Sequence, residues 1–279
     1  MIYEQLGPRA LNYAPCKYSN SRLLFRGPER RLDAPYVAFI GGTETYGKFI
    51  NAPYPSLVES NLGVNCINLG IVNAGVDVFL DDGFLTDAAN GAEAVVIQIV
   101  GAQNISNRFY TVHPRRNDRF LKASPLLQSI YPEVDFADFH FTRHMLSMLR
   151  HVSEQRFNVV VSELQEAWTA RMKMLLRRVY RDTILVWVAD REPLEAHDPL
   201  PDPVTSGHPL FVSRKMLDDL RRHASDIVLV RASEEAVKAG TTGMIFDEDS
   251  ASVAQHLLGP KAHGEIAMQL GKALTAYAK

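Results

Sequence analysis

Short apolar runs alternate with helix-like segments along most of the chain. The strand-like runs are 36–41, 64–70, 94–100, 183–189 and 226–230. The longer segments with apolar positions at helical spacing are 56–61, 76–89, 142–157, 162–181, 213–223 and 264–278. Strands that alternate with helices in this way predict βαβ units and a parallel sheet. We therefore expect an α/β fold: a three-layer α/β/α sandwich around a five-stranded, mostly parallel sheet, as in flavodoxin-like proteins.

Two details refine this pattern. The run 94–100 is almost wholly apolar, as expected for a strand buried on both faces of a sheet, but Gln98 interrupts it. The segment 162–181 begins with Ser162 and has Gln165 three residues later, which predicts a capping box and a helix that starts at Ser162. Trp168 and the methionines of these helices are expected in the core.

Composition favours one large domain. The chain has 279 residues, of which 46% are hydrophobic and 22% charged, enough to bury a sizeable core. Residues 1–34 are polar, proline-containing and arginine-rich, so we expect an N-terminal extension followed by a single domain over 35–279. Residues 104–140 form a long insertion after the third strand, and a connection of this length is typical of a functional loop or subdomain.

Charge and targeting signals narrow the function classes. A net charge of −2 argues against general nucleic-acid binding. The start of the chain lacks the basic-then-apolar order of a secretory signal, and no apolar run approaches the length of a membrane span. We expect a cytoplasmic protein that does not bind membranes. Cys16 and Cys66 are too few for a disulfide scaffold, and no motif indicates a cofactor or a metal.

The segment that follows the first strand carries most of the candidate chemistry. Glycines 41, 42 and 47 surround Thr43, which places a hydroxyl and unpaired backbone N–H groups at the carboxyl end of a strand, where open α/β sheets bind ligands. The run from Gly42 to Lys48 also satisfies the phosphate-binding pattern Gly-x-x-x-x-Gly-Lys, although Phe49 replaces the expected Ser or Thr. The run 184–190 would then be the metal-side strand. A simple tight turn is the remaining interpretation.

The same segment resembles the first block of the GDSL/SGNH hydrolases, Gly-Asp-Ser-x-Thr-x-Gly. Thr43 falls on the serine of that block and Gly42 on its aspartate. The family's two further oxyanion donors are expected after the second and third strands. In those places the chain offers Asn73 or Gly75, depending on the alignment, and then Asn104 or Gln103.

The segment 256–267 resembles the final block of the same family, in which a histidine precedes the last helix. The resemblance implies that His256 is the general base, and that Thr43 and His256 meet at the carboxyl edge of the sheet. The family's aspartate three residues before the histidine is replaced by Val253, and Asp247 or Asp249 are the alternative carboxylates. The chain is also similar to a bacterial family with the segments Gly-Gly-x-Glu-Thr-Tyr-Gly and Asn-Arg-Phe-Tyr-x-Val-His-Pro-Arg-Arg-Asn-Asp-Arg, which implies no activity.

Other histidines are weaker candidates. His208 precedes Pro209 and imitates the same block, but it lies before the fifth predicted strand rather than after it. The spacing of His113, His140 and His144 matches no familiar zinc pattern.

The insertion concentrates cations beside aromatic residues. Its candidate substrate-binding residues are Arg108, His113, Arg115, Arg116 and Arg119. Arginine side chains bind carboxylate, sulfate or phosphate groups at two points, which predicts an anionic substrate or glycan. The alternative is a solvated cluster that pairs with acidic neighbours such as Asp135 and Asp138.

Three functions follow from these patterns. One is an SGNH-like hydrolase or acyltransferase that acts on a small acyl ester of an acidic carbohydrate, with Thr43 as the nucleophile. Another is a catalytically silent SGNH-like domain that binds an anionic glycan or a protein partner. The last is a P-loop enzyme that transfers a nucleotide or a sulfate group.

Overall fold

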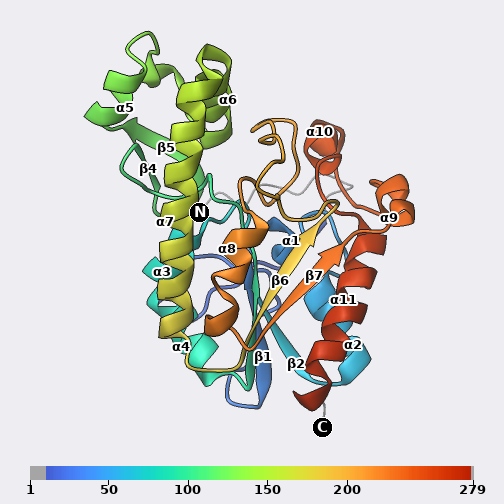
Figure 1. Ribbon diagram of the computed structural model, residues 1–279. Coiled ribbons are helices and arrows are strands. Elements are labelled where there is room, and N and C mark those ends of the chain that lie inside the picture. Colours follow the sequence, from blue (N-terminus) through green and yellow to red (C-terminus); the bar gives the residue numbers. More distant parts are fainter. Residues whose placement is uncertain (1–10, 278–279) are drawn as a thin grey trace.

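Five parallel strands form the central sheet of the protein. The structure, a computed structural model, describes residues 11–277 (Figure 1). The strands are β1 (Tyr36–Gly41), β2 (Asn65–Gly70), β3 (Ala94–Gln98), β6 (Thr183–Ala189) and β7 (Asp226–Arg231). Their order is β2-β1-β3-β6-β7, and every neighbouring pair is parallel. The predicted α/β class and five-stranded sheet are confirmed.

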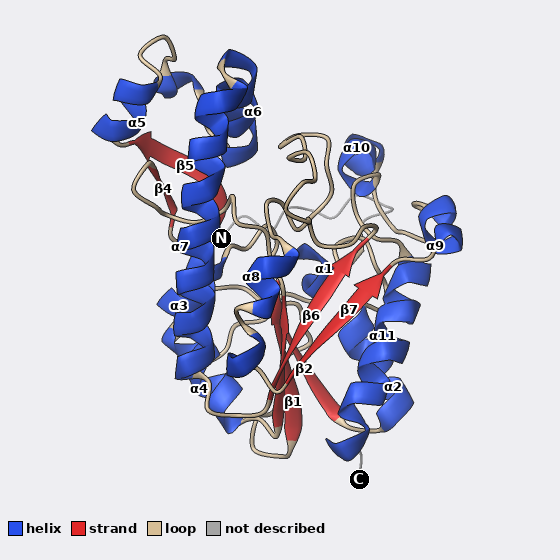
Figure 2. Cartoon of the chain, in the orientation of Figure 1, coloured by secondary structure: helices blue, strands red, loops and turns tan. Residues whose placement is uncertain are grey.

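Helices cover both faces of this sheet, which gives the expected three layers (Figure 2). On one face lie α2 (Tyr54–Leu62) and α11 (Pro260–Leu274). The other face is covered by α3 (Val76–Asp81), α4 (Gly83–Gly91), α7 (Glu154–Arg178) and α8 (Arg214–Asp218). Because successive side chains of a strand point to opposite faces, Val37 and Phe39 pack in the first layer and Ala38 and Ile40 in the second.

Several of the predicted helix boundaries are wrong. The helix expected over 142–157 ends at Val152, and the one expected over 213–223 is divided into α8 and the 3₁₀ turn η2 (Arg221–His223). The segment 76–89 is not one helix, because Asp82 has an extended backbone (φ −96°, ψ 107°) and separates α3 from α4. The helix predicted to start at Ser162 starts eight residues earlier, at Glu154, directly after α6 (Thr142–Val152). The hydroxyl of Ser153 caps it by accepting a hydrogen bond from the N–H of Arg156 at 3.3 Å. Ser162 therefore lies inside α7.

The insertion forms a small lobe beside the carboxyl end of the sheet (Figure 1). Its strands β4 (Tyr110–His113) and β5 (Arg116–Ala123) make an antiparallel hairpin. The hairpin is followed by α5 (Pro125–Ile130) and the 3₁₀ turn η1 (Phe136–Asp138). We call residues 105–140 the hairpin lobe. The antiparallel pair was not expected from the sequence, because the charged residues of β5 hide its alternation.

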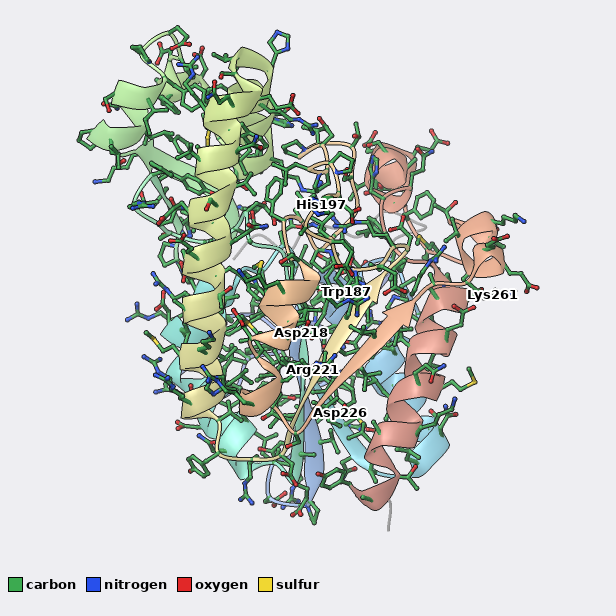
Figure 3. All side chains as sticks on the ribbon, viewed as in Figure 1. Trp187, His197, Asp218, Arg221, Asp226 and Lys261 are labelled. Carbon is green, nitrogen blue, oxygen red and sulfur yellow. The ribbon has the colours of Figure 1, made fainter. Side chains whose placement is uncertain are left out.

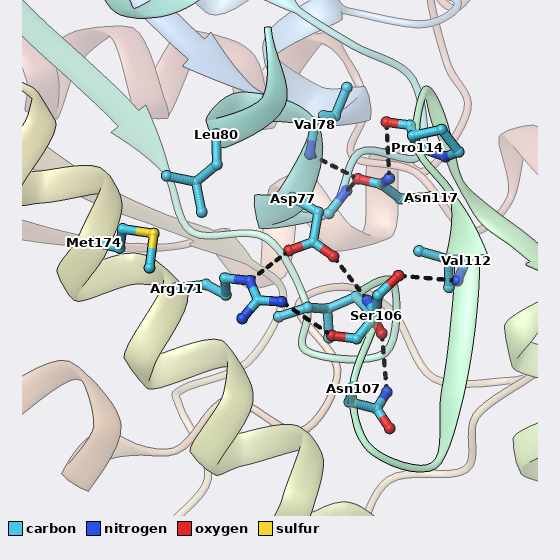
Figure 4. A network of polar contacts seen from close by, with 12 residues as sticks. Asp77, Val78, Leu80, Ser106, Asn107, Val112, Pro114, Asn117, Arg171 and Met174 are labelled. Atoms are coloured by element: carbon cyan, nitrogen blue, oxygen red, sulfur yellow. Dashed lines mark hydrogen bonds and ion pairs between the residues drawn. The ribbon is translucent and has the colours of Figure 1, made fainter. Parts of the chain in front are cut away.

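A polar network joins the hairpin lobe to the helices beneath it (Figure 4). Asp77 in α3 is mostly buried, and its carboxylate accepts hydrogen bonds from Nε of Arg171 at 3.0 Å and from the N–H of Ser106 at 2.8 Å. Arg171 lies on α7, so a single carboxylate connects α3, α7 and the start of the lobe. This arrangement fixes the lobe against the sandwich.

The remaining elements are short and lie around the edges of the sheet. They are α1 (Thr43–Tyr46), α9 (Glu234–Ala239), α10 (Ala251–Ala254), η2 (Arg221–His223), η3 (Glu248–Ser250) and η4 (Thr275–Tyr277). In the N-terminal segment, Phe25 is buried and Tyr18 stacks on Phe84 with ring centroids 5.2 Å apart. The first ten residues of the predicted extension, which include the segment tested for a targeting signal, lie outside the described residues. Within residues 11–277, no helix is long and apolar enough to cross a membrane.

One buried histidine holds the layer formed by α2 and α11. His263 is 1% exposed, and its Nδ1 accepts a hydrogen bond from the N–H of Tyr54 at 3.1 Å. Its ring also stacks on Tyr54, with centroids 5.8 Å apart. Burial, and secondarily the cation of Arg26, lower the pKa of His263 to about 3. The ring is therefore neutral in the folded protein across the usual pH range.

This neutral ring makes the stability depend on pH. Unfolding returns His263 to a pKa near 6.5, so its contribution is complete above that value and is lost as the pH falls toward about 3. In this window the unfolded chain binds a proton that the folded chain does not. We expect His263→Gln to reduce the acid slope of the free energy of unfolding by up to about 1.4 kcal/mol per pH unit, measured by urea titration between pH 7 and pH 4.5. His151→Gln, at an exposed position, is the control and should keep the wild-type dependence of the unfolding free energy on pH. If His263→Gln shows the same pH dependence as this control, His263 does not have this role.

Candidate functional site

The turn between β1 and α1 is organised by the side chain of Gln98. Its Oε1 accepts hydrogen bonds from the N–H of Gly42 at 2.8 Å, the N–H of Thr45 at 3.1 Å and the hydroxyl of Thr45 at 2.6 Å. Gly41 must be a glycine here, because a Cβ at that position would lie 1.9 Å from Oγ1 of Thr45 and 2.7 Å from Gln98. The polar residue that interrupts the third apolar run thus fixes the turn that carries Thr43.

The other end of the same amide binds Glu44. Nε2 of Gln98 donates to Oε2 of Glu44 at 2.7 Å, and Glu44 is 7% exposed. Burial raises the pKa of Glu44, partly offset by this hydrogen bond and by the cation of Arg143. No pattern in the sequence indicates that this carboxyl group faces inward at the edge of the sheet.

The turn does not form the phosphate cradle that the Gly-x-x-x-x-Gly-Lys pattern suggested. The N–H groups of Gly42 and Thr45 are bound by Gln98, and those of residues 46–48 donate to carbonyl groups of the turn itself. The ammonium of Lys48 lies over the ring of Phe49, 4.9 Å from its centroid. The amides of Gly42 and of residues 45–48 are therefore already used, so the turn offers no continuous row of free N–H groups to a phosphate.

Thr43 lies at the start of α1, and its hydroxyl faces the loop after β2. Its Oγ accepts a hydrogen bond from the N–H of Asn73 at 3.0 Å. Asn73 has a left-handed backbone (φ 57°), which turns this N–H toward the hydroxyl. Nδ2 of Asn104 donates to the carbonyl of Asn73 at 3.1 Å, and Oδ1 of Asn104 accepts from the hydroxyl of Thr142 at 2.7 Å. Thr43, Asn73 and Asn104 therefore converge from the ends of three strands.

Gly75 and Gln103, the alternatives to Asn73 and Asn104, are placed differently. The N–H of Gly75 donates to Oδ1 of Asn117 at 2.9 Å, and a Cβ on Gly75 would lie 1.6 Å from the carbonyl oxygen of Asn104. The lack of a side chain at Gly75 therefore permits two loops to approach closely. Its N–H already has an acceptor in Asn117 and is not free to bind an oxyanion. The amide of Gln103 faces His208, with Nε2 3.4 Å from Nδ1. Asn117 was missed in the sequence because it stands among the arginines of the hairpin lobe.

A cleft and a smaller cavity adjoin these groups. The cleft has a volume of about 250 Å³, and its walls include Asn73, Asn104, Arg143, His144 and His208. Asp118 also lines it, where one carboxylate oxygen accepts from Nδ2 of Asn73 at 3.2 Å. The cavity, of about 150 Å³, lies at the carboxyl ends of β6 and β7 and includes Glu44, Asp190, His208 and His256. Figure 3 shows this edge, with Trp187 near the end of β6 and Asp226 at the opposite edge.

His256 lies at this edge of the sheet, in the connection between α10 and α11. It is exposed, and it lines the cavity that also includes Glu44, the residue after Thr43. Within residues 11–277, no carboxylate forms a hydrogen bond to His256 or His208, and Asp247 instead accepts a hydrogen bond from the N–H of Ser250 at 2.9 Å. The pairing of Thr43 with His256 stays a prediction.

The arginines of the hairpin lobe fall into two groups. Nε of Arg108 lies 2.6 Å from Oε2 of Glu163, and the guanidinium of Arg119 lies over Phe141, 4.3 Å from the ring centroid. Arg115 and Arg116 are exposed and line an open groove of about 430 Å³. In the described part of the chain, neither of these two forms an ion pair, and the alternative pairing of the cluster with Asp135 and Asp138 is not formed.

His113 stabilises the hairpin turn, because its Nδ1 accepts hydrogen bonds from the N–H groups of Arg115 at 3.2 Å and Arg116 at 3.3 Å. The ring of His144 makes an edge contact with Phe141, with centroids 5.9 Å apart. Among residues 11–277, no three His, Cys, Asp or Glu side chains are grouped so as to hold a metal ion.

A family model described as "Domain of unknown function (DUF6473)" matches residues 1–278. The chain belongs to this family. A search of curated proteins gives no match to this DUF6473 chain.

Solved structures of esterases and lipases are similar to this DUF6473 chain at low scores. A lipase/acylhydrolase from Enterococcus faecalis has a TM-score of 0.43 and 9% identity, and the match covers 88% of this chain and 98% of the other. A catalytic mutant of an acetylxylan esterase from Geobacillus stearothermophilus has a TM-score of 0.43 and 13% identity, and the match covers 85% of this chain and 93% of the other. A family two carbohydrate esterase from Clostridium thermocellum has a TM-score of 0.40 and 10% identity, and the match covers 91% of this chain and 67% of the other. We assign the fold from the order and the directions of the strands in this chain.

The central place of Gln98 can be tested through stability. Gln98→Leu keeps the volume but leaves the buried N–H groups of Gly42 and Thr45 without an acceptor, at roughly 1–3 kcal/mol for each group. We expect a loss of about 3 kcal/mol in the free energy of unfolding, measured by urea titration. The same substitution at the exposed Gln128 is the control. A change below about 0.5 kcal/mol in Gln98→Leu would show that the turn does not depend on this amide.

Proposed function

We propose that the protein is a divergent SGNH-like hydrolase or acyltransferase that acts on a small acyl ester. The observation that carries the proposal is the 3.0 Å contact between the N–H of Asn73 and Oγ of Thr43, in a turn at the carboxyl edge of the sheet. A donor so close to an attacking oxygen is within reach of the oxyanion that forms on the same acyl carbon. The neighbouring cleft has room for a small acyl group.

In the proposed reaction, Oγ of Thr43 forms a bond to the acyl carbon and loses its proton to a histidine. His208 and His256, which line the cavity beside Glu44, are the two candidates. The carbonyl oxygen becomes an oxyanion, which is stabilised by the N–H of Asn73 and by the N–H of Thr43, which helix α1 leaves free at its first turn.

Asn104 supplies the remaining donor to the oxyanion. The tetrahedral intermediate then breaks down. One amide hydrogen of Asn104 binds the carbonyl of Asn73, and its second is available to the oxyanion. When the ester C–O bond breaks, the leaving alcohol takes the proton from the histidine. Water, or an acceptor hydroxyl in an acyltransferase, then attacks the Thr43 ester in the same way.

The proposal predicts how Thr43 variants behave. Thr43→Ala should reduce kcat/KM on acetyl and short acyl esters by at least a hundredfold, because the attacking oxygen is removed. Thr43→Ser should retain or exceed the wild-type rate, since serine keeps the hydroxyl and lacks the methyl group that restricts its approach. Rates are measured with chromogenic esters.

Thr242→Ala, at an exposed position, is the control for this pair and should leave the rate unchanged. Equal rates for the wild type and Thr43→Ala would instead favour a silent binding domain. That second candidate has one observation in its favour: within the described residues, neither candidate histidine is hydrogen-bonded to a carboxylate.

An anionic substrate is the second part of the proposal. Arg115 and Arg116 share an open groove with Arg22, and Val72, which precedes Asn73, lines the same groove. Within the described residues these three guanidinium groups form no ion pair, and their place beside the proposed oxyanion loop favours a carboxylate or sulfate group on the substrate, as in an acidic carbohydrate.

Removing two of these cations should weaken anion binding. We expect the double variant Arg115→Ala, Arg116→Ala to raise KM or Kd for a uronate-containing or sulfated glycan at least tenfold, and the wild-type affinity to fall as salt increases. Calorimetry with charged and neutral glycans measures both effects. Arg221→Ala, Arg222→Ala removes the same charge from η2, away from the groove, and serves as the control. If neutral and anionic glycans bind equally well, the groove does not select anions.

A further inference from the structure

His208 lies where the cleft and the cavity meet. It is the residue that lines both the cleft with Asn73 and Asn104 and the cavity with Glu44 and His256. It belongs to the long loop between β6 and β7, on the same carboxyl edge of the sheet as Thr43. A proton acceptor at this place faces the groups that the proposed function assigns to the oxyanion.

The loop that carries His208 is held by two arginines. One nitrogen of Arg143, on α6, donates to the carbonyls of Pro203, Val204 and Ser206, at 3.0, 3.3 and 3.0 Å. On the other side of His208, Arg191 donates to the carbonyl of Pro209. The backbone on both sides of the histidine is therefore fixed to neighbouring elements, which places its Cα beside the cleft.

The side-chain amide of Gln103 lies beside the ring of His208. Its Nε2 lies 3.4 Å from Nδ1 of His208. Gln103 is 1% exposed, and its Oε1 is buried without a hydrogen-bond partner within the described residues. Rotating the amide by 180° exchanges the two atoms with almost no change in shape. Oε1 then accepts a hydrogen bond from Nδ1–H of His208, and Nε2 takes the buried place that Oε1 leaves.

We propose that Gln103 is a positioning residue that holds His208 as the Nδ1–H tautomer, with Nε2 presented to the cleft as the proton acceptor for Thr43. This inference rests on the proposed function, and it assigns the base to His208 rather than to His256. The proton of Thr43 passes to Nε2 as Oγ bonds to the acyl carbon, and it leaves with the alcohol when the ester bond breaks. Nδ1–H stays bound to Gln103 throughout.

The charged surroundings favour a neutral ring. Burial, then the cations of Arg143 and Arg191, lower the pKa of His208 to about 3. The other titratable groups that line the two cavities are Glu44, Asp118, Asp190, His144 and His256. A neutral amide at Nδ1 is consistent with this environment, since it accepts the hydrogen bond without attracting a second proton. The lone pair on Nε2 is then available over the whole pH range above about 4.

Turnover measurements distinguish the two histidines. We expect His208→Ala to lower kcat/KM by about 10²–10⁴, the usual contribution of a general base, and to do so more strongly than His256→Ala. His197→Ala, on the exposed part of the same loop, is the control (Figure 3). A larger loss in His256→Ala than in His208→Ala overturns the inference but leaves the proposed function intact. A wild-type protein that hydrolyses no ester in the panel overturns the proposed function.

The role of Gln103 has a readout that a structural role would not change. Wild-type kcat/KM should remain level down to about pH 5, where a base with an ordinary pKa near 6.5 would have lost about thirtyfold. In Gln103→Glu the new carboxylate stabilises the imidazolium, so the acid limb should move to higher pH. Gln103→Leu should lower kcat without moving the acid limb of the pH–rate profile to higher pH. Identical pH profiles in the wild type and Gln103→Glu contradict the positioning role.

The tautomer can be observed without any substrate. In the full-length protein with ¹⁵N-labelled histidine, long-range proton–nitrogen correlation spectra distinguish Nδ1–H from Nε2–H, and His208→Asn identifies the signals. The expected result for His208 is Nδ1–H. An Nε2–H signal in the wild-type protein overturns the inference even if both variants at position 103 fail to fold.

Discussion

The three hydrogen bonds accepted by Oε1 of Gln98 are the constraint on which the rest of the site depends. The donors are the N–H of Gly42, one residue before Thr43, and the N–H and hydroxyl of Thr45, two residues after it. The central strand β3 therefore determines the path of a turn that belongs to β1. A buried carbonyl with three donors and no solvent is costly to disrupt, because each donor would be left unpaired.

The same amide explains why the edge of the sheet combines a hydroxyl with a buried acid. The hydrogen bonds from Gln98 hold α1 so that Thr43 faces the loop after β2 and Glu44 faces the cavity at the ends of β6 and β7. Burial raises the pKa of Glu44, so this carboxyl group keeps its proton to a higher pH than an exposed glutamic acid. The oxyanion of the proposed reaction would be repelled less by a protonated carboxyl group than by a carboxylate.

The sequence predicted the sheet well because continuous apolar runs have few alternatives to buried parallel strands. It placed Thr43 in the turn after β1 because the surrounding glycines mark a tight turn, and it left Asn73 and Gly75 as alternatives in the loop after β2. The left-handed backbone of Asn73 is visible only in the structure. The sequence did not predict the roles of Gln98, Glu44 and Asn117, since these depend on which atom each polar side chain contacts in a segment 39 to 56 residues away along the chain. The helix boundaries failed at Asp82 and Ser153 because apolar periodicity continues through both.

The hairpin lobe has a consequence for how the chain can be shortened. Long surface insertions can usually be removed at little cost, since they contribute mainly loop entropy. Here Asn117, at the start of β5, accepts hydrogen bonds from the N–H groups of Gly75 and Val78, both of which belong to the sandwich. Its Nδ2 donates to the carbonyl of His113, so the hairpin itself holds that amide in place. A truncated domain would lose the acceptor that begins α3, and the loop that carries Asn73 would lose its anchor. The minimal unit of this architecture therefore includes the lobe.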